Sequence, residues 1–439
     1  MISSRTLLSM SFGNALSQPF NVLWRSALVK LPRAVPKEIL KWTCPQGPHP
    51  IVIDLPSPRG KHKIPVFVFV PRSITPERKD PVPVVIDFHG GGFWMGSCLE
   101  QAPFCTTMAN ELDAVVVSVD YRMAPVDSYP AAQEDADDVL HAVLHQSAPG
   151  YTVLRDGIRK KILSRWKHAQ KKSSTSSVDR SPERAPSLSH IDLDKSKIAV
   201  TGFSSGGNLA MNIGMHISGS DGQKEWPSPF PPDHPYPFAL VLYYAAIDLQ
   251  QLPSERTRPP KLPAPKGWWS ELNDMLAPAY LPRERAAEYR ASPGLAPIES
   301  SLHKQARLQF VLAEVDALTP QNDEWLSKAS KAGRSDDIVV HRYEDQTHGW
   351  TQMPETWLNE EQRRTREDAY NKTIAFIKST WTNEDLSPLR MQSSSGFLSA
   401  DVSETQATTK KGHKFWKRSP RSSPRPSRTP SPIQEAGVE

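Results

Sequence analysis

The feature of this chain that most constrains its fold is a series of short apolar runs that alternate with helical patterns. The runs are rich in Val and Ile and nearly continuous, as expected of strands that are buried on both faces. They span residues 84–88, 114–119, 197–201, 239–245, 309–313 and 338–343. Helical patterns between and after them span residues 131–145, 208–217, 321–332 and 360–377. This alternation predicts an α/β fold with a mostly parallel central sheet and helices on both faces.

Two further apolar runs come before these strands. Residues 51–55 and 64–70 are joined by the turn-forming sequence Ser57-Pro58-Arg59-Gly60-Lys61. Short apolar runs joined in this way predict a hairpin. We expect the hairpin to lie at one edge of the sheet.

Two glycine-rich segments each follow a predicted strand and indicate where chemistry takes place. The first, His89-Gly90-Gly91-Gly92-Phe93, lets backbone N–H groups turn into a cavity that any Cβ would obstruct. Such donors suit the negative oxygen of a tetrahedral acyl-transfer intermediate. About 110 residues later, Gly202-Phe203-Ser204-Ser205-Gly206 fits the nucleophile elbow G-x-S-x-G, whose strained turn exposes the serine hydroxyl. Found in this order, the two segments predict a hydrolase.

A nucleophilic serine needs a base to take its proton and a carboxylate to orient that base. Asp316 and His348 both follow Ser204 in the chain, and each comes just after a predicted strand. Because an open parallel sheet binds ligands at the carboxyl ends of its strands, we expect the three side chains to meet there. His341 lies inside the last strand, and we expect it to be an ordinary surface histidine.

The ordered set of motifs resembles the hormone-sensitive-lipase branch of the α/β-hydrolases. Besides the two glycine-rich segments, the matching pieces are residues 120–125, 129–132, 292–293, 316–318 and 348–349. The likeness covers roughly residues 51 to 378. It implies an α/β-hydrolase fold with an eight-stranded sheet and a cap built from the N-terminus plus an insertion. It also implies ester hydrolysis with no cofactor and no metal.

The resemblance further implies a role for each matching residue. The catalytic residues are Ser204 as nucleophile, His348 as general base and then acid, and Asp316 as the group that orients the histidine. The oxyanion hole is formed by the backbone N–H groups of Gly91, Gly92 and Ser205, and the loop is supported by His89 and Gly90.

Two departures from the family pattern stand near these residues. Phe203 and Ser205 replace the Asp and Ala that the family usually has beside the nucleophile. Thr319 and Pro320 replace charged residues after Asp316, where Pro can occupy the first turn of a helix. Neither departure removes a reacting atom.

The composition indicates a packed domain with disordered additions, because the chain has 42 prolines and only 38% hydrophobic residues. We expect N-terminal cap helices at residues 1–48, the hydrolase domain at 49–382 and a disordered tail rich in Ser, Pro and Arg at 383–439. Within the domain, residues 150–190 form a basic insertion. Residues 250–304 form a cap insertion, with a helix expected over residues 268–280.

The N-terminal segment leaves two interpretations open. Residues 1–37 contain basic residues and serines but no acid, a composition typical of mitochondrial targeting segments. The alternative is an amphipathic helix around residues 16–31 that packs over the active site. The three cysteines are too few for a disulfide framework and fit a reducing compartment.

Two basic segments predict contacts outside the active site. In residues 151–172, apolar residues recur at spacings of three and four with Arg and Lys between them, which is typical of membrane-surface or partner-binding helices. Residues 410–428 hold eight basic residues and no acid. We expect both segments to contact anionic membranes peripherally. The alternative for the helix is that it lies on its own domain with its charges solvated. The alternatives for residues 410–428 are a nuclear-import signal and a disordered tail without a partner. A net charge of +5 by itself implies no nucleic-acid partner.

These observations predict an intracellular, cytoplasmic serine carboxylesterase or lipase-like hydrolase. We expect it to cleave short- to medium-chain acyl esters of small molecules through an acyl-enzyme intermediate. One alternative is a deacetylase or amidase acting on an aryl or secondary-metabolite substrate. Another is a non-catalytic binding protein on a hydrolase fold, like the gibberellin receptors that resemble this family. Those receptors lose the base histidine, whereas this chain keeps His348.

Overall fold

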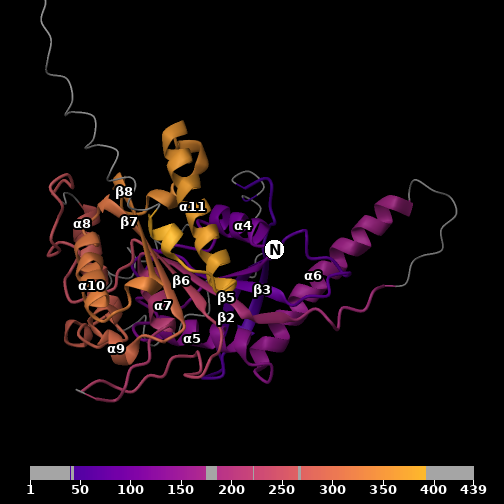
Figure 1. The fold of residues 1–439 in the computed structure, drawn as a ribbon, viewed down its shortest axis with the longest axis horizontal. Coiled ribbons are helices and arrows are strands. Elements are labelled where there is room, and N and C mark those ends of the chain that lie inside the picture. The colour runs from indigo at the N-terminus through magenta and orange to yellow at the C-terminus, as the bar shows by residue number, and fades with distance from the viewer. Residues whose placement is uncertain (1–39, 41–43, 175–184, 221, 265–267, 392–439) are drawn as a thin grey trace, which may run out of the picture. The chain divides into compact units, whose positions relative to one another are not determined.

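The apolar runs form a single eight-stranded sheet in the order β1-β2-β4-β3-β5-β6-β7-β8 (Figure 1). The computed structural model describes residue 40 and residues 44–174, 185–220, 222–264 and 268–391. The strands are β1 Ile51–Pro56, β2 Lys63–Phe69, β3 Val82–Phe88, β4 Val115–Val119, β5 Leu193–Phe203, β6 Phe238–Tyr243, β7 Ala306–Val315 and β8 Ile338–Thr347. The hairpin β1–β2 is antiparallel and lies at one edge, and β2 pairs antiparallel with β4. All other pairs are parallel, which confirms the predicted fold class.

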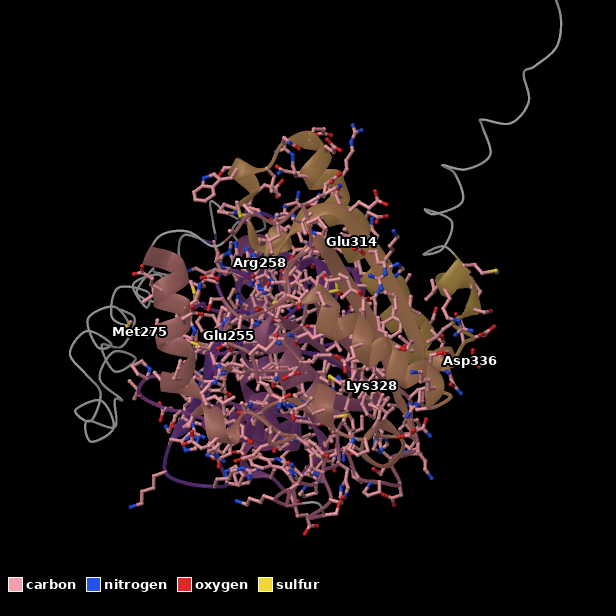
Figure 2. All side chains as sticks on the ribbon, turned by 90° about the vertical axis from the view of Figure 1, so that its left-hand side faces the viewer. Glu255, Arg258, Met275, Glu314, Lys328 and Asp336 are labelled. Atoms are coloured by element: carbon pink, nitrogen blue, oxygen red, sulfur yellow. The ribbon has the colours of Figure 1, made fainter. Side chains whose placement is uncertain are left out.

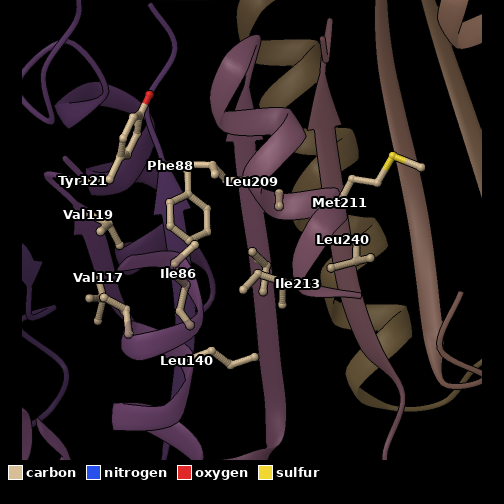
Figure 3. Packing of buried hydrophobic residues seen from close by; sticks show 14 of the residues in the cluster. Ile86, Phe88, Val117, Val119, Tyr121, Leu140, Leu209, Met211, Ile213 and Leu240 are labelled. Atoms are coloured by element: carbon tan, nitrogen blue, oxygen red, sulfur yellow. The ribbon is translucent and has the colours of Figure 1, made fainter. Parts of the chain in front are cut away.

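Helices cover both faces of this sheet. They are α4 Ala102–Glu111, α5 Ala131–Leu144, α6 Pro149–Ser174, α7 Ser205–Ile213, α8 Trp268–Tyr280, α9 Ile298–Ser301, α10 Thr319–Lys331 and α11 Glu360–Trp381. Side chains that alternate along a strand enter different cores. On β3, Ile86 and Phe88 pack with Leu140 of α5 and Leu209 of α7 (Figure 3). Val85 points the other way, into a second core shared with α4 and α11.

Two helices differ from the sequence-based expectation. The short helix α4 was not expected, because its sequence mixes Thr and Asn with its apolar residues. Phe104 and Met108 of this helix are nevertheless fully buried in the second core. Helix α7 ends at Ile213, four residues before the expected end. Its last expected residues pair instead in isolated bridges, Met215 with Leu302 and Ile217 with Trp226.

The basic helix α6 packs along the edge of the domain, and its C-terminal half extends away from the sheet (Figure 1). Its apolar residues Tyr151, Leu154, Ile158 and Ile162 are all buried. Gly157 permits close contact with β1, since a Cβ there would come within 2.3 Å of Ile53 Cδ1. This apolar stripe of α6 is therefore buried against its own domain.

Two arginines of α6 are bound by backbone carbonyl groups. Arg165 donates from Nη1 to the carbonyl oxygens of Val70 at 3.1 Å and Pro71 at 2.8 Å, and from Nη2 to Ile74 at 2.8 Å. Arg159 donates from Nη2 to the carbonyl oxygen of Ile191 at 2.6 Å. These guanidinium groups tie the helix to the segment after β2 and to the segment before β5.

The chain stays packed beyond residue 382, where the tail was expected to begin. Leu386 is buried in the second core. Arg307 of β7 donates to the carbonyl oxygen of Glu384 at 2.7 Å. Arg390 in turn donates from Nη1 to the Asp336 carbonyl oxygen at 2.6 Å, so contacts with the domain continue to this residue.

Several expectations fall outside the described residues. They concern the cap helices and targeting segment within residues 1–39 and the tail from residue 392 onward, including the basic residues at 410–428. Among the helices that the structure describes, none combines the length and apolar character required to span a bilayer.

Candidate active site

Ser204 lies in a sharp turn between β5 and α7. Its backbone has φ 53° and ψ −114°, a conformation that side-chain-bearing residues rarely adopt. Glycines before and after it make the turn feasible. A Cβ on Gly202 would come within 2.0 Å of the Gly206 oxygen, and one on Gly206 within 2.0 Å of the Phe88 oxygen. The glycines of the G-x-S-x-G segment are therefore required by backbone contacts.

The structure brings Ser204, His348 and Asp316 together. His348 Nε2 lies 2.9 Å from Ser204 Oγ, and His348 Nδ1 lies 2.7 Å from Asp316 Oδ2. Asp316 directly follows β7, and its Oδ1 accepts a hydrogen bond from the Leu318 backbone N–H at 2.9 Å. His348 directly follows β8, and its side chain is 43% exposed, whereas that of Asp316 is 4% exposed. A solvent-facing imidazole is thus held by a buried carboxylate.

The loop of Gly90, Gly91 and Gly92 lies beside the serine in the same cavity. Gly91 has φ +126°, and a Cβ there would come within 2.0 Å of the Met95 oxygen. Gly92 has φ +63°, and its Cβ would meet the Trp94 ring at 2.8 Å. Both positions need glycine, because the loop combines left-handed backbone with close approach of other chain atoms.

His89 holds this loop from beneath. Its Nδ1 lies 2.7 Å from the Gly90 oxygen, and its ring stacks on Tyr121 with 4.4 Å between ring centroids. The Tyr121 hydroxyl in turn donates to the His89 carbonyl oxygen at 2.8 Å. His89, Cys98 and Asp120 also form the one group, within the described part of the chain, that places three metal-ligating atoms within 4.8 Å of one another. Structural zinc sites use four ligands, and His89 Nδ1 is already engaged by the loop.

Phe203, the unusual residue before the nucleophile, is buried. Its ring stacks on Tyr243 at 4.5 Å and meets the edge of Phe104 at 5.0 Å. The position where the family usually has a carboxylate is therefore filled by aromatic packing. The other departure, Thr319-Pro320, starts helix α10 with Pro in its first turn, as expected.

A cavity of about 480 Å³ opens above the serine. Its walls include the glycine loop, Phe93, Trp94, Leu252, Ala277, Leu281, Val315 and the three arginines Arg256, Arg258 and Arg283. Most of the wall is apolar, and one side of it comes from residues 249–286, which largely coincide with the first part of the expected cap insertion. The expected helix over residues 268–280 is present as α8. The cavity is large enough for a small molecule.

Aromatic residues close to the motifs could line an acyl or alcohol pocket or serve as ordinary packing. Phe93 and Trp94 line the cavity. Trp350 packs on Tyr343 at 5.0 Å between ring centroids in the second core and is not among the residues lining the cavity. The side chains of Trp268 and Trp269 lie outside the described part. The expectation for His341 was wrong, because its side chain is buried on the inner face of β8. Burial lowers the pKa of His341 to about 4.

A buried carboxylate lies in the sheet below the elbow. Asp87 of β3 accepts hydrogen bonds from Ser118 Oγ at 2.9 Å, from Thr201 Oγ1 at 2.9 Å and from Cys105 Sγ at 3.4 Å. Burial raises the pKa of Asp87 to about 6, although these three donors act to lower it. No motif pointed to this residue, whose only signal was an acid inside an apolar run.

A sheet of this topology, with a serine turn after its fifth strand and an acid and a histidine after its seventh and eighth, defines an α/β-hydrolase. A family model described as alpha/beta hydrolase fold matches residues 85–352, which is more than half of the 439 residues. The chain belongs to this family, and the esterase/lipase assignment made from its motifs is confirmed.

Individual relatives agree with this membership. Probable carboxylesterase 8 of Arabidopsis thaliana is 33% identical over 165 residues, which are 36% of this chain and 39% of that protein. An AB hydrolase superfamily protein of Schizosaccharomyces pombe is 27% identical over 302 residues, 66% of this chain and 70% of that protein. The crystal structure of esterase LipW from Mycobacterium marinum is 19% identical, with a TM-score of 0.50 over 84% of this chain and 90% of that one. That last likeness is one of fold.

Proposed function

We propose that this protein is a serine carboxylesterase that cleaves short- to medium-chain acyl esters of small molecules. The observation that carries the proposal is the chain of contacts from Asp316 Oδ2 to His348 at 2.7 Å and from His348 to Ser204 Oγ at 2.9 Å. A hydroxyl, an imidazole and a carboxylate in that order are the parts that nucleophilic acyl transfer requires.

The reaction follows from this geometry. Ser204 Oγ attacks the ester carbonyl carbon while His348 Nε2 takes the serine proton. The oxygen that becomes negative accepts hydrogen bonds from the backbone N–H groups of Gly91, Gly92 and Ser205. The tetrahedral intermediate then collapses, His348 returns the proton to the leaving alcohol, and the acyl group stays on Ser204. Water, deprotonated by His348, attacks this acyl-enzyme and releases the carboxylic acid.

The first test is turnover of p-nitrophenyl butyrate by purified protein and by Ser204→Ala. We expect the substitution to lower kcat by roughly 10⁴-fold or more. The matched control is Ser205→Ala, which keeps the backbone N–H and is expected to cost far less. Turnover that persists undiminished in Ser204→Ala would overturn the proposal. A panel of esters and the corresponding anilides separates an esterase from the alternative deacetylase or amidase.

The glycine loop has its own test in Gly91→Ala. The new Cβ would collide with the Met95 oxygen at 2.0 Å, so the loop must move and its N–H donors with it. Loss of one such donor costs about 10²- to 10³-fold in kcat. Loss of activity with an unchanged melting temperature supports the oxyanion role, whereas full activity contradicts it.

We further infer an intracellular location and a peripheral, purely electrostatic contact of α6 with anionic membranes. The cysteines Cys44, Cys98 and Cys105 form no disulfide, which fits a reducing compartment. On α6 the apolar residues Tyr151, Leu154, Ile158 and Ile162 are buried, so exposed cations such as Lys160 and Lys167 are the main groups that remain for a membrane. Binding to phosphatidylserine vesicles should weaken as salt rises from 50 to 500 mM. Co-sedimentation with the vesicles that does not depend on salt, or that Lys160→Glu/Lys167→Glu leaves unchanged, contradicts a contact through α6.

A further inference from the structure

The cavity beside the serine contains a guanidinium group without a hydrogen-bond acceptor. Arg256 lines this cavity together with Ser204 and His348. Its Nε is buried and has no acceptor, while the side chain as a whole is half-buried at the cavity wall. No hydrogen bond or ion pair of this guanidinium is found within the described part of the chain. Removing a charged group from water without a partner is costly, so an unpartnered arginine beside a reactive serine needs an explanation.

Each of the two other arginines of the cavity wall has a partner, although Arg258 Nε is, like Arg256 Nε, buried without an acceptor. Arg258 Nη2 donates to the Pro263 carbonyl oxygen at 2.5 Å. Arg283 Nη1 donates to Glu255 Oε2 at 2.7 Å, an ion pair whose two side chains are both exposed. Figure 2 shows Glu255 and Arg258 on the segment that runs beside α8. Arg256 is therefore the one of these three arginines for which no hydrogen bond or ion pair is found among the described residues.

The acids near Arg256 are occupied by other groups. Burial lowers the pKa of the Arg256 guanidinium, while the charges of Asp316, Asp248 and Asp274 act to raise it. Asp316 accepts hydrogen bonds from His348 and from the Leu318 N–H. Asp248 Oδ1 accepts from the Gln250 N–H at 2.9 Å. Asp274 Oδ1 accepts from the Ser254 N–H at 3.0 Å. Their negative charges favour the charged form of Arg256, but among the described residues none of them forms an ion pair with it.

We propose that Arg256 binds a carboxylate carried by the substrate, so that the preferred substrates are anionic esters. A planar guanidinium can donate two parallel hydrogen bonds to a carboxylate. The wall between Arg256 and the serine includes Leu252 and Leu281, which suits an apolar spacer between the charged end and the scissile ester. This inference rests on the proposed esterase function and specifies its substrate class.

The test compares esters that differ only in charge. On the acyl side, the pair is the p-nitrophenyl monoester of adipic acid and the p-nitrophenyl ester of its monoamide. On the alcohol side, the pair is 4-acetoxybenzoate and 4-acetoxybenzamide. We expect the wild type to prefer the anionic member of at least one pair by about 10- to 100-fold in kcat/KM, as charge-assisted hydrogen bonds allow. Arg256→Gln should abolish that preference, and Arg256→Lys should retain part of it.

The matched control is Arg285→Gln, which removes an arginine of the cap insertion that pairs with Glu288 and is not among the residues lining the cavity. This variant should keep the anionic-to-neutral ratio of the wild type. A readout independent of turnover is the melting temperature in 20 mM adipate, which should rise for Ser204→Ala and not for Ser204→Ala/Arg256→Gln. If Arg256→Gln folds poorly, the rise in melting temperature of Ser204→Ala with adipate is measured at increasing salt. Salt should reduce this rise, because it competes with adipate for a charged group.

The outcomes separate the two proposals. Neutral esters cleaved in a Ser204-dependent way, with no anionic preference in either pair, contradict the role of Arg256 and leave the esterase in place. A preference that survives Arg256→Gln has the same consequence. Esters that are not cleaved at all contradict the proposed function. In that case a rise in melting temperature with adipate that depends on Arg256 still supports a carboxylate site, and its absence overturns one.

Discussion

The two insertions of this domain use arginine in opposite ways. In the basic insertion, Arg165 of α6 donates to three backbone carbonyls and Arg159 to others. In the cap insertion, Arg256 faces the cavity with no acceptor among the described residues. The first set stabilises the position of a helix. The second group lies in the cavity that holds the serine, where a bound molecule can supply what the protein does not.

The difference teaches that a run of basic residues has no single meaning. Residues 151–172 looked like a surface for partners, yet Tyr151, Leu154, Ile158 and Ile162 are buried and two of the arginines are bound to carbonyls. The cap insertion has no conspicuous basic pattern, yet it contains the arginine that is available to a ligand. Asp87 lies between these two cases, because its carboxylate has three hydrogen-bond donors and yet burial raises its pKa. Substitutions in α6, at Asp87 and at Arg256 should therefore differ in their effect on stability.

The largest effect is expected from Ile158→Ala in α6. Ile158 is 1% exposed in the main core, and truncation of a buried isoleucine costs about 4 kcal/mol in transfer and cavity terms. The measurement is the free energy of unfolding in urea. Val153, 39% exposed on the same helix, provides the control, and Val153→Ala should change stability by less than about 0.5 kcal/mol. Equal effects of the two substitutions would show that α6 does not pack as described.

The next effect is a pH dependence that belongs to Asp87. Its pKa is about 6 in the folded protein and close to 3.8 when unfolded, so the folded state takes up the proton first as pH falls. The folded state is therefore favoured at low pH, and this contribution is lost as pH rises through 6. Between pH 8 and pH 4.5 the wild type should gain about 2 kcal/mol relative to Asp87→Asn.

The comparison with Asp87→Asn isolates the carboxylate from other titrating groups. The pKa of His341 is lowered to about 4, so its contribution to the free energy of unfolding falls as pH falls below 6.5. This change is the same in both proteins. Parallel curves of unfolding free energy against pH in the two proteins would mean that Asp87 is not buried as a carboxyl group.

Arg165→Ala should cost about 1.5 kcal/mol of stability. The substitution removes three hydrogen bonds, each with a modest net contribution because the carbonyls of this edge regain water. Urea unfolding measures it, with Lys160→Ala, an exposed cation on the same helix, as the control. The ratio of anionic to neutral ester cleavage should not respond to either change. A response of that ratio would place α6 in contact with the substrate site.

The smallest effect on stability, with the opposite sign, is expected for Arg256→Gln. Removing a buried, unpartnered charge should leave the melting temperature unchanged or raise stability by up to about 1 kcal/mol. The same variant is the one expected to lose the preference for anionic esters. Strong destabilisation would instead indicate that Arg256 has a structural role like that of Arg165, and the contrast between the insertions would disappear.

Much of this architecture could be predicted from the sequence, because strands buried on both faces leave a strong apolar signal. Each expected strand run coincides with a strand, although β5, β7 and β8 are longer than expected, and the helices α5, α8, α10 and α11 have nearly the expected bounds. Ser204, Asp316 and His348 could be singled out since each follows a strand, and the structure brings them within hydrogen-bond distance. Their catalytic roles remain a prediction for the Ser204→Ala experiment.

What could not be predicted depends on contacts between distant segments. His341 is buried because its strand carries α11 on that face, which no local pattern around it indicates. Helix α4 has too few apolar residues for a clear period. Arg256 is exceptional only through the absence of an acceptor, and an absence has no sequence signal.

The placement of His348 directly behind the last strand has a consequence for biogenesis. A growing chain cannot bring the imidazole to the serine until His348 itself has been synthesised and the eighth strand has docked beside the seventh. With His348 as the proposed base, premature termination or proteolytic removal of that strand should leave an inert product. During refolding from denaturant, regained turnover would report completion of the sheet, well after the earliest collapse of the chain.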